Sequence, residues 1–124
     1  MSLNIVIPNR NRDLAIVKRS LDTLAAQLNE RTQVTVVDYG SALAYQLTLQ
    51  ELIKTYKGID LILCPTQGQL WNKSRCINMV LKTCETTHFM VCDMDMLWNP
   101  DFLKIHLNQL PQDHAVYFTV GVMT

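Results

Sequence analysis

The chain has 124 residues, of which 48% are hydrophobic, so it is long enough and apolar enough for one globular domain with a buried core. Its formal net charge is +0, which excludes a general electrostatic attraction to nucleic acid or to an anionic membrane. No apolar run approaches the roughly 20 residues of a transmembrane segment. Its four cysteines include no CxxC pair and predict reduced, buried thiols, so we expect a cytoplasmic protein.

The first half of the chain alternates short apolar runs with amphipathic ones. Residues 3–8 are apolar and end at a proline, which predicts a strand. Asp13 then precedes apolar residues with the three-and-four spacing of an amphipathic helix. These apolar residues are Leu14, Val17, Leu21, Leu24 and Leu28. A β-branched run over 33–37 predicts a second strand, and residues 44–56 predict a second helix that ends near Gly58.

The second half continues the same alternation. Residues 60–64 predict a third strand, and residues 71–84 predict a helix with one apolar stripe. Residues 89–92 predict a fourth strand, Pro100 marks the start of another helix, and residues 115–122 predict a fifth strand.

Alternating helices and near-continuous apolar strands are typical of an α/β fold with a parallel sheet. We therefore expect residues 1–124 to form a single domain, built on a mostly parallel sheet of about five strands with helices on both faces. In such sheets, ligands bind in the crevice outside the carboxyl ends of the strands.

Asp93 and Asp95 directly follow the fourth predicted strand and are separated by one residue. Strand side chains alternate between faces, so the two carboxylates would point the same way if the strand continued to Asp95. Two such anions repel each other, and a hard divalent cation such as Mn²⁺ or Mg²⁺, shared with phosphates, would relieve the repulsion. The alternative interpretation is an ordinary Asp-rich turn.

Other polar residues fall at the same predicted edge of the sheet. Arg10 and Arg12 follow the first strand and can bind phosphate through their forked donors, and Asp38 ends the second strand. Trp71 and Lys73 begin the third helix, where Lys73 can pair with a phosphate. An ordinary polar loop explains any one of them, but together they predict a nucleoside diphosphate site. No GxGxxG follows the first strand, so a nicotinamide or flavin enzyme is not expected.

Four segments resemble, in chain order, segments of the GT-A (Rossmann-like) nucleotide-sugar glycosyltransferases. They are residues 8–12 (PNRNR), 37–41 (VDYGS), 71–78 (WNKSRCIN) and 93–95 (DMD). The first and third are most similar to the β-1,4-galactosyltransferase and chondroitin-polymerase branch, with its PFRNR-type and FNRAxxxN-like segments. The second resembles the VVDDGS turn of family 2 glycosyltransferases.

The resemblance implies a metal-dependent glycosyltransferase that binds a UDP-sugar donor and transfers the sugar to a carbohydrate or glycoconjugate acceptor. Asp38 would bind uracil or ribose, and Asp95, with Asp93, would belong to the site of Mn²⁺ (or Mg²⁺). The residues implied to contact the nucleotide are Pro8, Arg10, Arg12, Asp38, Trp71, Lys73 and Asp93.

The chain departs from the family pattern at two positions and lacks its later segments. Asn9 replaces an aromatic residue, and Lys73 replaces an arginine and so loses the bidentate fork. The catalytic base is unknown, because His106 and His114 are better explained as surface residues. We therefore expect the donor-binding, N-terminal half of the fold, truncated after the fifth strand.

Two alternatives to a glycosyltransferase remain. The first is a non-catalytic GT-A-like remnant that binds nucleotide or self-associates as a homo-oligomer, since a half fold leaves sheet edges and apolar surface uncovered. The second is a haloacid dehalogenase-type phosphatase, which also has a DxD after a strand. We disfavour it because Leu97 stands where that family has Thr or Val.

Overall fold

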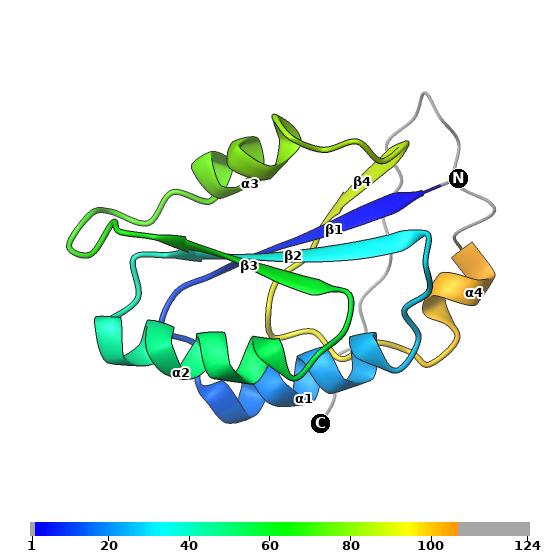
Figure 1. Ribbon diagram of the computed structural model, residues 1–124, viewed down its shortest axis with the longest axis horizontal. Coiled ribbons are helices and arrows are strands. Elements are labelled where there is room, and N and C mark those ends of the chain that lie inside the picture. Colours follow the sequence, from blue (N-terminus) through cyan, green and yellow to red (C-terminus); the bar gives the residue numbers. More distant parts are fainter. Residues whose placement is uncertain (1, 107–124) are drawn as a thin grey trace.

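The computed structural model describes residues 2–106, which form a parallel sheet between two helical layers (Figure 1). The strands are β1 (Leu3–Asn9), β2 (Thr32–Tyr39), β3 (Ile59–Cys64) and β4 (His88–Val91). They lie in the order β3-β2-β1-β4, so β1 and β2 are central. The α/β prediction is confirmed, with four strands in the described part rather than about five. The expected fifth strand, residues 115–122, lies outside the described residues.

The helices cover both faces of the sheet, as predicted. Helices α1 (Leu14–Ala25) and α2 (Leu43–Lys54) lie on one face, and α3 (Lys73–Leu81) lies on the other (Figure 1). The short α4 (Phe102–His106) adds its buried Leu103 to the core beside α1 and α2.

Helix α3 begins later than the expected range of 71–84. The side chain of Asn72 accepts a hydrogen bond from the backbone N–H of Arg75, which caps the helix there. Trp71 therefore precedes the helix instead of opening it, and its side chain extends from the loop before the cap.

Strand alternation divides the apolar side chains into two cores. Ile5 and Ile7 of β1 face α1 and α2, whereas Val6 faces the opposite side and packs in one cluster with Cys76 of α3. The expectation of free, buried thiols is confirmed except at Cys84, which is only partly buried. Burial raises the pKa of Cys76 to about 11, so this thiol stays protonated at neutral pH.

Pro8 occupies a place in β1 where its missing N–H removes no sheet hydrogen bond. The Val6 carbonyl accepts a hydrogen bond from the backbone N–H of Cys92, which follows β4. The backbone N–H and C=O groups of even-numbered residues in β1 therefore point toward β4, and those of odd-numbered residues point toward β2. The pairing between β1 and β4 ends at Val6, before Pro8 is reached. A proline is therefore tolerated in this central strand, and its ring is buried.

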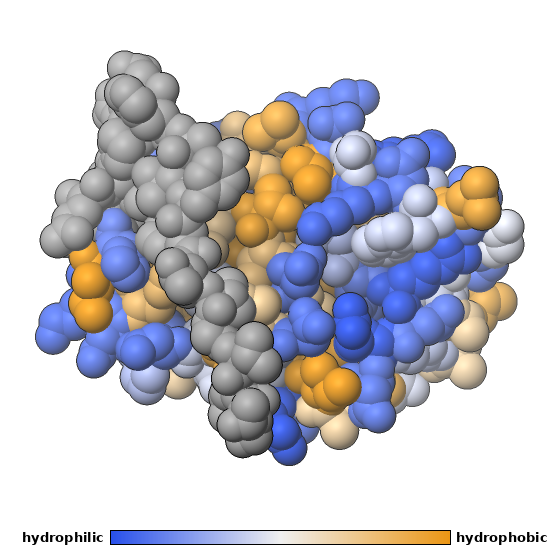
Figure 2. Space-filling view, turned by 180° about the vertical axis from the view of Figure 1, so that it is seen from behind, coloured by the Kyte–Doolittle hydropathy of each residue, from blue (hydrophilic) through white to orange (hydrophobic). Residues whose placement is uncertain are grey.

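Several large apolar side chains remain exposed on the described surface. Leu43 and Leu47 on α2 are 68% and 66% exposed, and Leu70 before α3 is 91% exposed. Figure 2 shows apolar side chains, in orange, gathered near the middle of the face seen from behind. No helix among residues 2–106 is long and apolar enough to cross a membrane.

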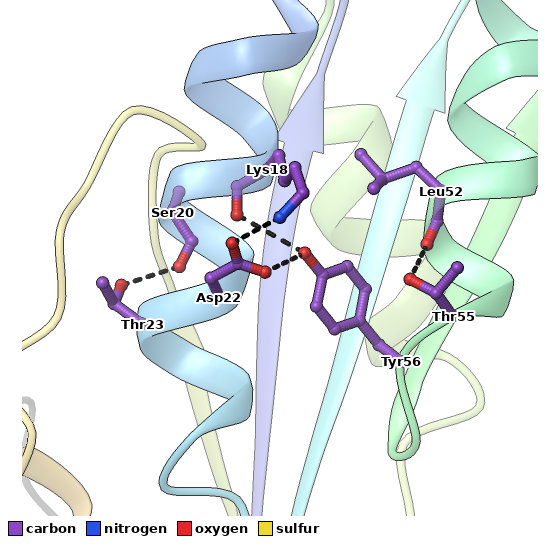
Figure 3. Close-up of polar contacts among 7 residues, drawn as sticks. All are labelled: Lys18, Ser20, Asp22, Thr23, Leu52, Thr55 and Tyr56. Carbon is purple, nitrogen blue, oxygen red and sulfur yellow. Dashed lines mark hydrogen bonds and ion pairs between the residues drawn. The ribbon is translucent and has the colours of Figure 1, made fainter.

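A polar cluster joins α1 to the end of α2 (Figure 3). The Tyr56 hydroxyl donates to the Asp22 carboxylate, and Lys18 Nζ lies 2.8 Å from the other oxygen of the same carboxylate. These contacts lower the pKa of Asp22, with the Lys18 hydrogen bond as the larger cause. Burial and the bond to Asp22 raise the pKa of Tyr56.

Replacing Tyr56 by Phe should lower the midpoint of thermal unfolding at neutral pH by roughly 2–4 °C, because an exposed carboxylate loses one donor. The lowered pKa of Asp22 stabilises the fold fully above the ordinary value of 3.8, and this stabilisation is lost as the pH falls through the lowered pKa. The difference between wild type and variant should therefore shrink in acid. Thermal melts at neutral and acid pH test this, and a difference independent of pH would contradict it.

Candidate donor site

The two carboxylates after β4 each meet a cation from a distant loop. Lys73 Nζ lies 2.9 Å from Asp93 Oδ1, and Arg12 Nη1 lies 3.6 Å from Asp95 Oδ2. All four side chains are 45–60% exposed, so water screens both ion pairs and each stabilises the fold by at most about 1 kcal/mol. Both pairs can therefore exchange for a ligand at little cost in stability.

Local apolar residues explain why both carboxylates reach solvent. Strand β4 ends at Val91, before the DxD, so the strand itself does not continue to Asp95. Cys92 and Met94 are buried, whereas Asp93 and Asp95 between and beyond them are exposed. Burial and the charge of Asp93 raise the pKa of the Cys92 thiol to about 12, so this thiol stays protonated at neutral pH.

Asp38 lies beneath the site and not on its surface. Its side chain is 0% exposed, and its two oxygens accept four hydrogen bonds. The donors are Asn9 Nδ2 at 3.1 Å, Ser41 Oγ at 2.7 Å, the Ser41 backbone N–H at 3.2 Å and Gln46 Nε2 at 2.8 Å. Four donors around one carboxylate match its acceptor-only chemistry. Contact of Asp38 with uracil or ribose stays a prediction.

The loop between β3 and α3 brings Arg10 and Trp71 to the same edge of the sheet. Arg10 Nη1 donates to the carbonyl of Gln69 at 2.6 Å. Trp71 is 45% exposed and lies edge-on to Tyr39, with 6.1 Å between ring centroids. An aromatic face that is half-exposed and held by another ring is suited to contact with a nucleotide base.

Gly40 allows this loop to approach the end of β2. It has a φ of +76°, and a Cβ at this position would lie 2.5 Å from the carbonyl oxygen of Thr66. Any other residue would be strained and would displace the loop that carries Trp71.

The structure thus places Arg12 beside Asp95 and Lys73 beside Asp93, at the edge of the sheet where the sequence predicts all four. Arg10, on the same loop as Arg12, bonds to the β3–α3 loop that carries Trp71, while Pro8 is buried within β1. Sequence reasoning missed the polar residues around Asp38. The available signal was the pair of polar residues, Tyr45 and Gln46, on a helix whose inner face is otherwise apolar.

The carboxylates fit a hard divalent ion that takes some of its oxygen ligands from the protein and others from a diphosphate. Among residues 2–106, no three His, Cys, Asp or Glu side chains cluster to hold a metal by themselves. Asp93 and Asp95 are exposed oxygen donors, and Mn²⁺ or Mg²⁺ at such sites takes further oxygens from phosphate and water.

The sequence of this chain matches the model of a known protein family. The model for "Glycosyl transferase family 2" matches residues 4–124, which is nearly the whole chain. The chain belongs to glycosyl transferase family 2. No curated protein matches this family 2 chain.

Solved structures confirm the GT-A fold of this family 2 chain. S. aureus TarS 1–349 in complex with UDP-GlcNAc superposes with a TM-score of 0.69 at 24% identity, and it covers 87% of this chain and 30% of its own. A mannosyltransferase from Pyrobaculum calidifontis, PcManGT, in complex with GDP-Man and Mn²⁺, has a TM-score of 0.67 at 21% identity, covering 82% of this chain and 30% of its own.

This family 2 chain therefore spans about 30% of the length of these solved structures. The predicted membership in the GT-A family 2 glycosyltransferases is confirmed. Its closer similarity to the β-1,4-galactosyltransferase branch stays a prediction.

Proposed function

We propose that this chain forms the donor-binding part of a metal-dependent glycosyltransferase that uses a UDP-sugar. The observation that carries the proposal is the pair of exchangeable ion pairs, Lys73–Asp93 and Arg12–Asp95, at the carboxyl edge of a GT-A sheet. Family 2 membership supports it, and so does the UDP-GlcNAc complex of TarS.

The charges of the site suggest how a nucleotide-sugar would bind. Two carboxylates and two cations neutralise one another in pairs. A nucleotide diphosphate can take Arg12 and Lys73 as its counter-ions, which frees Asp95 and Asp93 for a metal ion. Metal and nucleotide should therefore favour each other's binding. A bound metal ion draws the carboxylates away from Arg12 and Lys73, and a bound diphosphate draws these cations away from the carboxylates.

Asp95 would hold the metal, with Asp93 beside it hydrogen-bonded to the ribose or sugar. A bound Mn²⁺ or Mg²⁺ supplies Lewis-acid stabilisation of the negative charge on the departing UDP. Arg12 and Lys73 would add to that stabilisation through charge-assisted hydrogen bonds to the diphosphate, while Arg10 and Trp71 bind the rest of the nucleotide.

We further propose that residues 1–124 act as one nucleotide-sugar-binding unit, and that the acceptor-binding residues and the catalytic base belong to another part of the complete enzyme. A second candidate, a non-catalytic nucleotide-binding unit that self-associates, is favoured by the exposed Leu43, Leu47 and Leu70. Light scattering tests the second candidate, since a strictly monomeric species would contradict self-association.

Calorimetric titration of UDP with and without Mn²⁺ tests the proposed function. We expect binding in the presence of Mn²⁺ to be at least about tenfold tighter than in its absence, because the ion releases Arg12 from Asp95. GDP serves as the control for base selectivity and should bind more weakly than UDP. Absence of UDP binding in both conditions would contradict the proposal.

A further inference from the structure

The loop that carries Arg12 turns sharply and is fastened to the start of α2. Asn11 has a φ of +50°, a left-handed conformation that asparagine tolerates better than most residues. Its backbone N–H donates to Ser41 Oγ at 2.8 Å, and its side-chain oxygen accepts from the backbone N–H of Ala42 at 3.1 Å. Asn11 therefore fixes one point of this loop, one residue before Arg12.

Tyr45 fastens the loop at a second point. Its hydroxyl donates to the backbone carbonyl of Arg12 and accepts a hydrogen bond from Asn9 Nδ2 at 3.1 Å. The same Asn9 amide donates to Asp38 Oδ1, so the hydroxyl belongs to a chain of hydrogen bonds that begins at a fully buried carboxylate. A buried end makes such a chain rigid, because its members have few alternative partners.

The chemistry of the Tyr45 hydroxyl suits this role. Burial raises the pKa of Tyr45, so the phenol keeps its proton and remains a donor at neutral pH. The ring packs against the core between α2 and the sheet, and the hydroxyl makes the hydrogen bond to the loop. Packing and positioning can therefore be separated by removing the oxygen alone.

We propose that Tyr45 is a positioning residue that holds the main chain of Arg12 so that its guanidinium stands at the donor site. This inference rests on the proposed function for its effect on nucleotide affinity. Its structural part, the order of the loop, does not depend on that function. Tyr45 itself touches neither metal nor diphosphate in this assignment; it acts through Arg12, whose side chain lies 3.6 Å from Asp95.

Tyr45→Phe tests the proposal and Tyr56→Phe is its matched control. Both tyrosine hydroxyls donate to a residue of another segment, Tyr45 to the Arg12 carbonyl and Tyr56 to the Asp22 carboxylate. With Mn²⁺ present, Tyr45→Phe should weaken UDP binding by roughly three- to tenfold, the effect of losing one hydrogen bond at the loop. Tyr56→Phe should leave the affinity unchanged.

A double-mutant cycle with Arg12→Gln separates positioning from a general loss of stability. If Tyr45 acts through Arg12, Tyr45→Phe should cause no further loss of affinity once Arg12 has been replaced. Independent, additive losses would overturn the proposal, and so would an unchanged affinity in Tyr45→Phe when the wild type binds UDP.

Backbone ¹⁵N relaxation of the protein without nucleotide gives a second readout. The order parameters of Asn11 and Arg12 should fall in Tyr45→Phe and stay unchanged in Tyr56→Phe. If the wild type fails to bind UDP, the proposed function fails, yet this measurement still decides whether Tyr45 orders the loop. Unchanged order parameters in Tyr45→Phe would overturn the inference.

Discussion

Asp95→Asn should abolish the Mn²⁺-dependent part of UDP binding and weaken the apparent affinity with Mn²⁺ by at least about tenfold. The Asp95 side chain is 48% exposed beside the Arg12 guanidinium, and the substitution removes its charge while keeping its shape. Without metal, the effect of Asp95→Asn on the affinity for UDP should no longer be a loss. The variant should bind UDP as tightly as the wild type or more tightly, because Arg12 no longer has a carboxylate partner. Calorimetric titration in both conditions measures the two effects.

Asp101→Asn is the matched control for this experiment. Asp101 is also exposed and lies in the segment after the DxD, just before α4. Its replacement should change neither the affinity for UDP nor the effect of Mn²⁺. Equal losses in both variants would indicate a nonspecific effect of charge and would contradict a metal role for Asp95.

Asp38→Ala should lower the free energy of unfolding by about 3 kcal/mol, because buried donors lose the carboxylate that accepts from them. The donors come from Asn9, Ser41 and Gln46, which lie on β1, after β2 and on α2. The substitution therefore loosens the junction of three elements at once. Urea denaturation monitored by circular dichroism measures the change.

Asp60→Ala provides the comparison for a surface aspartate on the neighbouring strand. Asp60 is exposed and accepts one hydrogen bond from Gln33 Nε2 at 3.0 Å. Its replacement should change the free energy of unfolding by less than about 0.5 kcal/mol. If Asp38→Ala were as stable as Asp60→Ala, the buried hydrogen bonds of Asp38 would not support the fold as we infer.

The sequence predicted much of this fold because strand and helix periodicity are local properties. The alternation of apolar runs located β1 to β4 and the helices between them, although it placed Trp71 inside α3. That error arose at a cap. The Asn72 side chain ends the loop by bonding to the Arg75 N–H, and the apolar stripe of the helix does not report where its first turn begins.

The sequence predicted which residues belong to the candidate site, but it did not predict which of them form ion pairs with one another. The sequence alone indicated that Asp93 and Asp95 follow an apolar strand and that Arg12 and Lys73 share the same edge of the sheet. Which cation meets which carboxylate depends on the crossovers that place β4 beside β1. That arrangement is a property of the whole sheet.

Asp38 marks the limit of what the sequence determines. Its position at the end of a β-branched strand indicated the functional edge, and the resemblance suggested a nucleotide contact. Only the tertiary structure decided that its carboxylate lies fully buried, with donors from β1, from the turn after β2 and from α2. Burial depends on which side chains the folded elements bring together, whereas periodicity determines only the face of the strand from which a side chain extends.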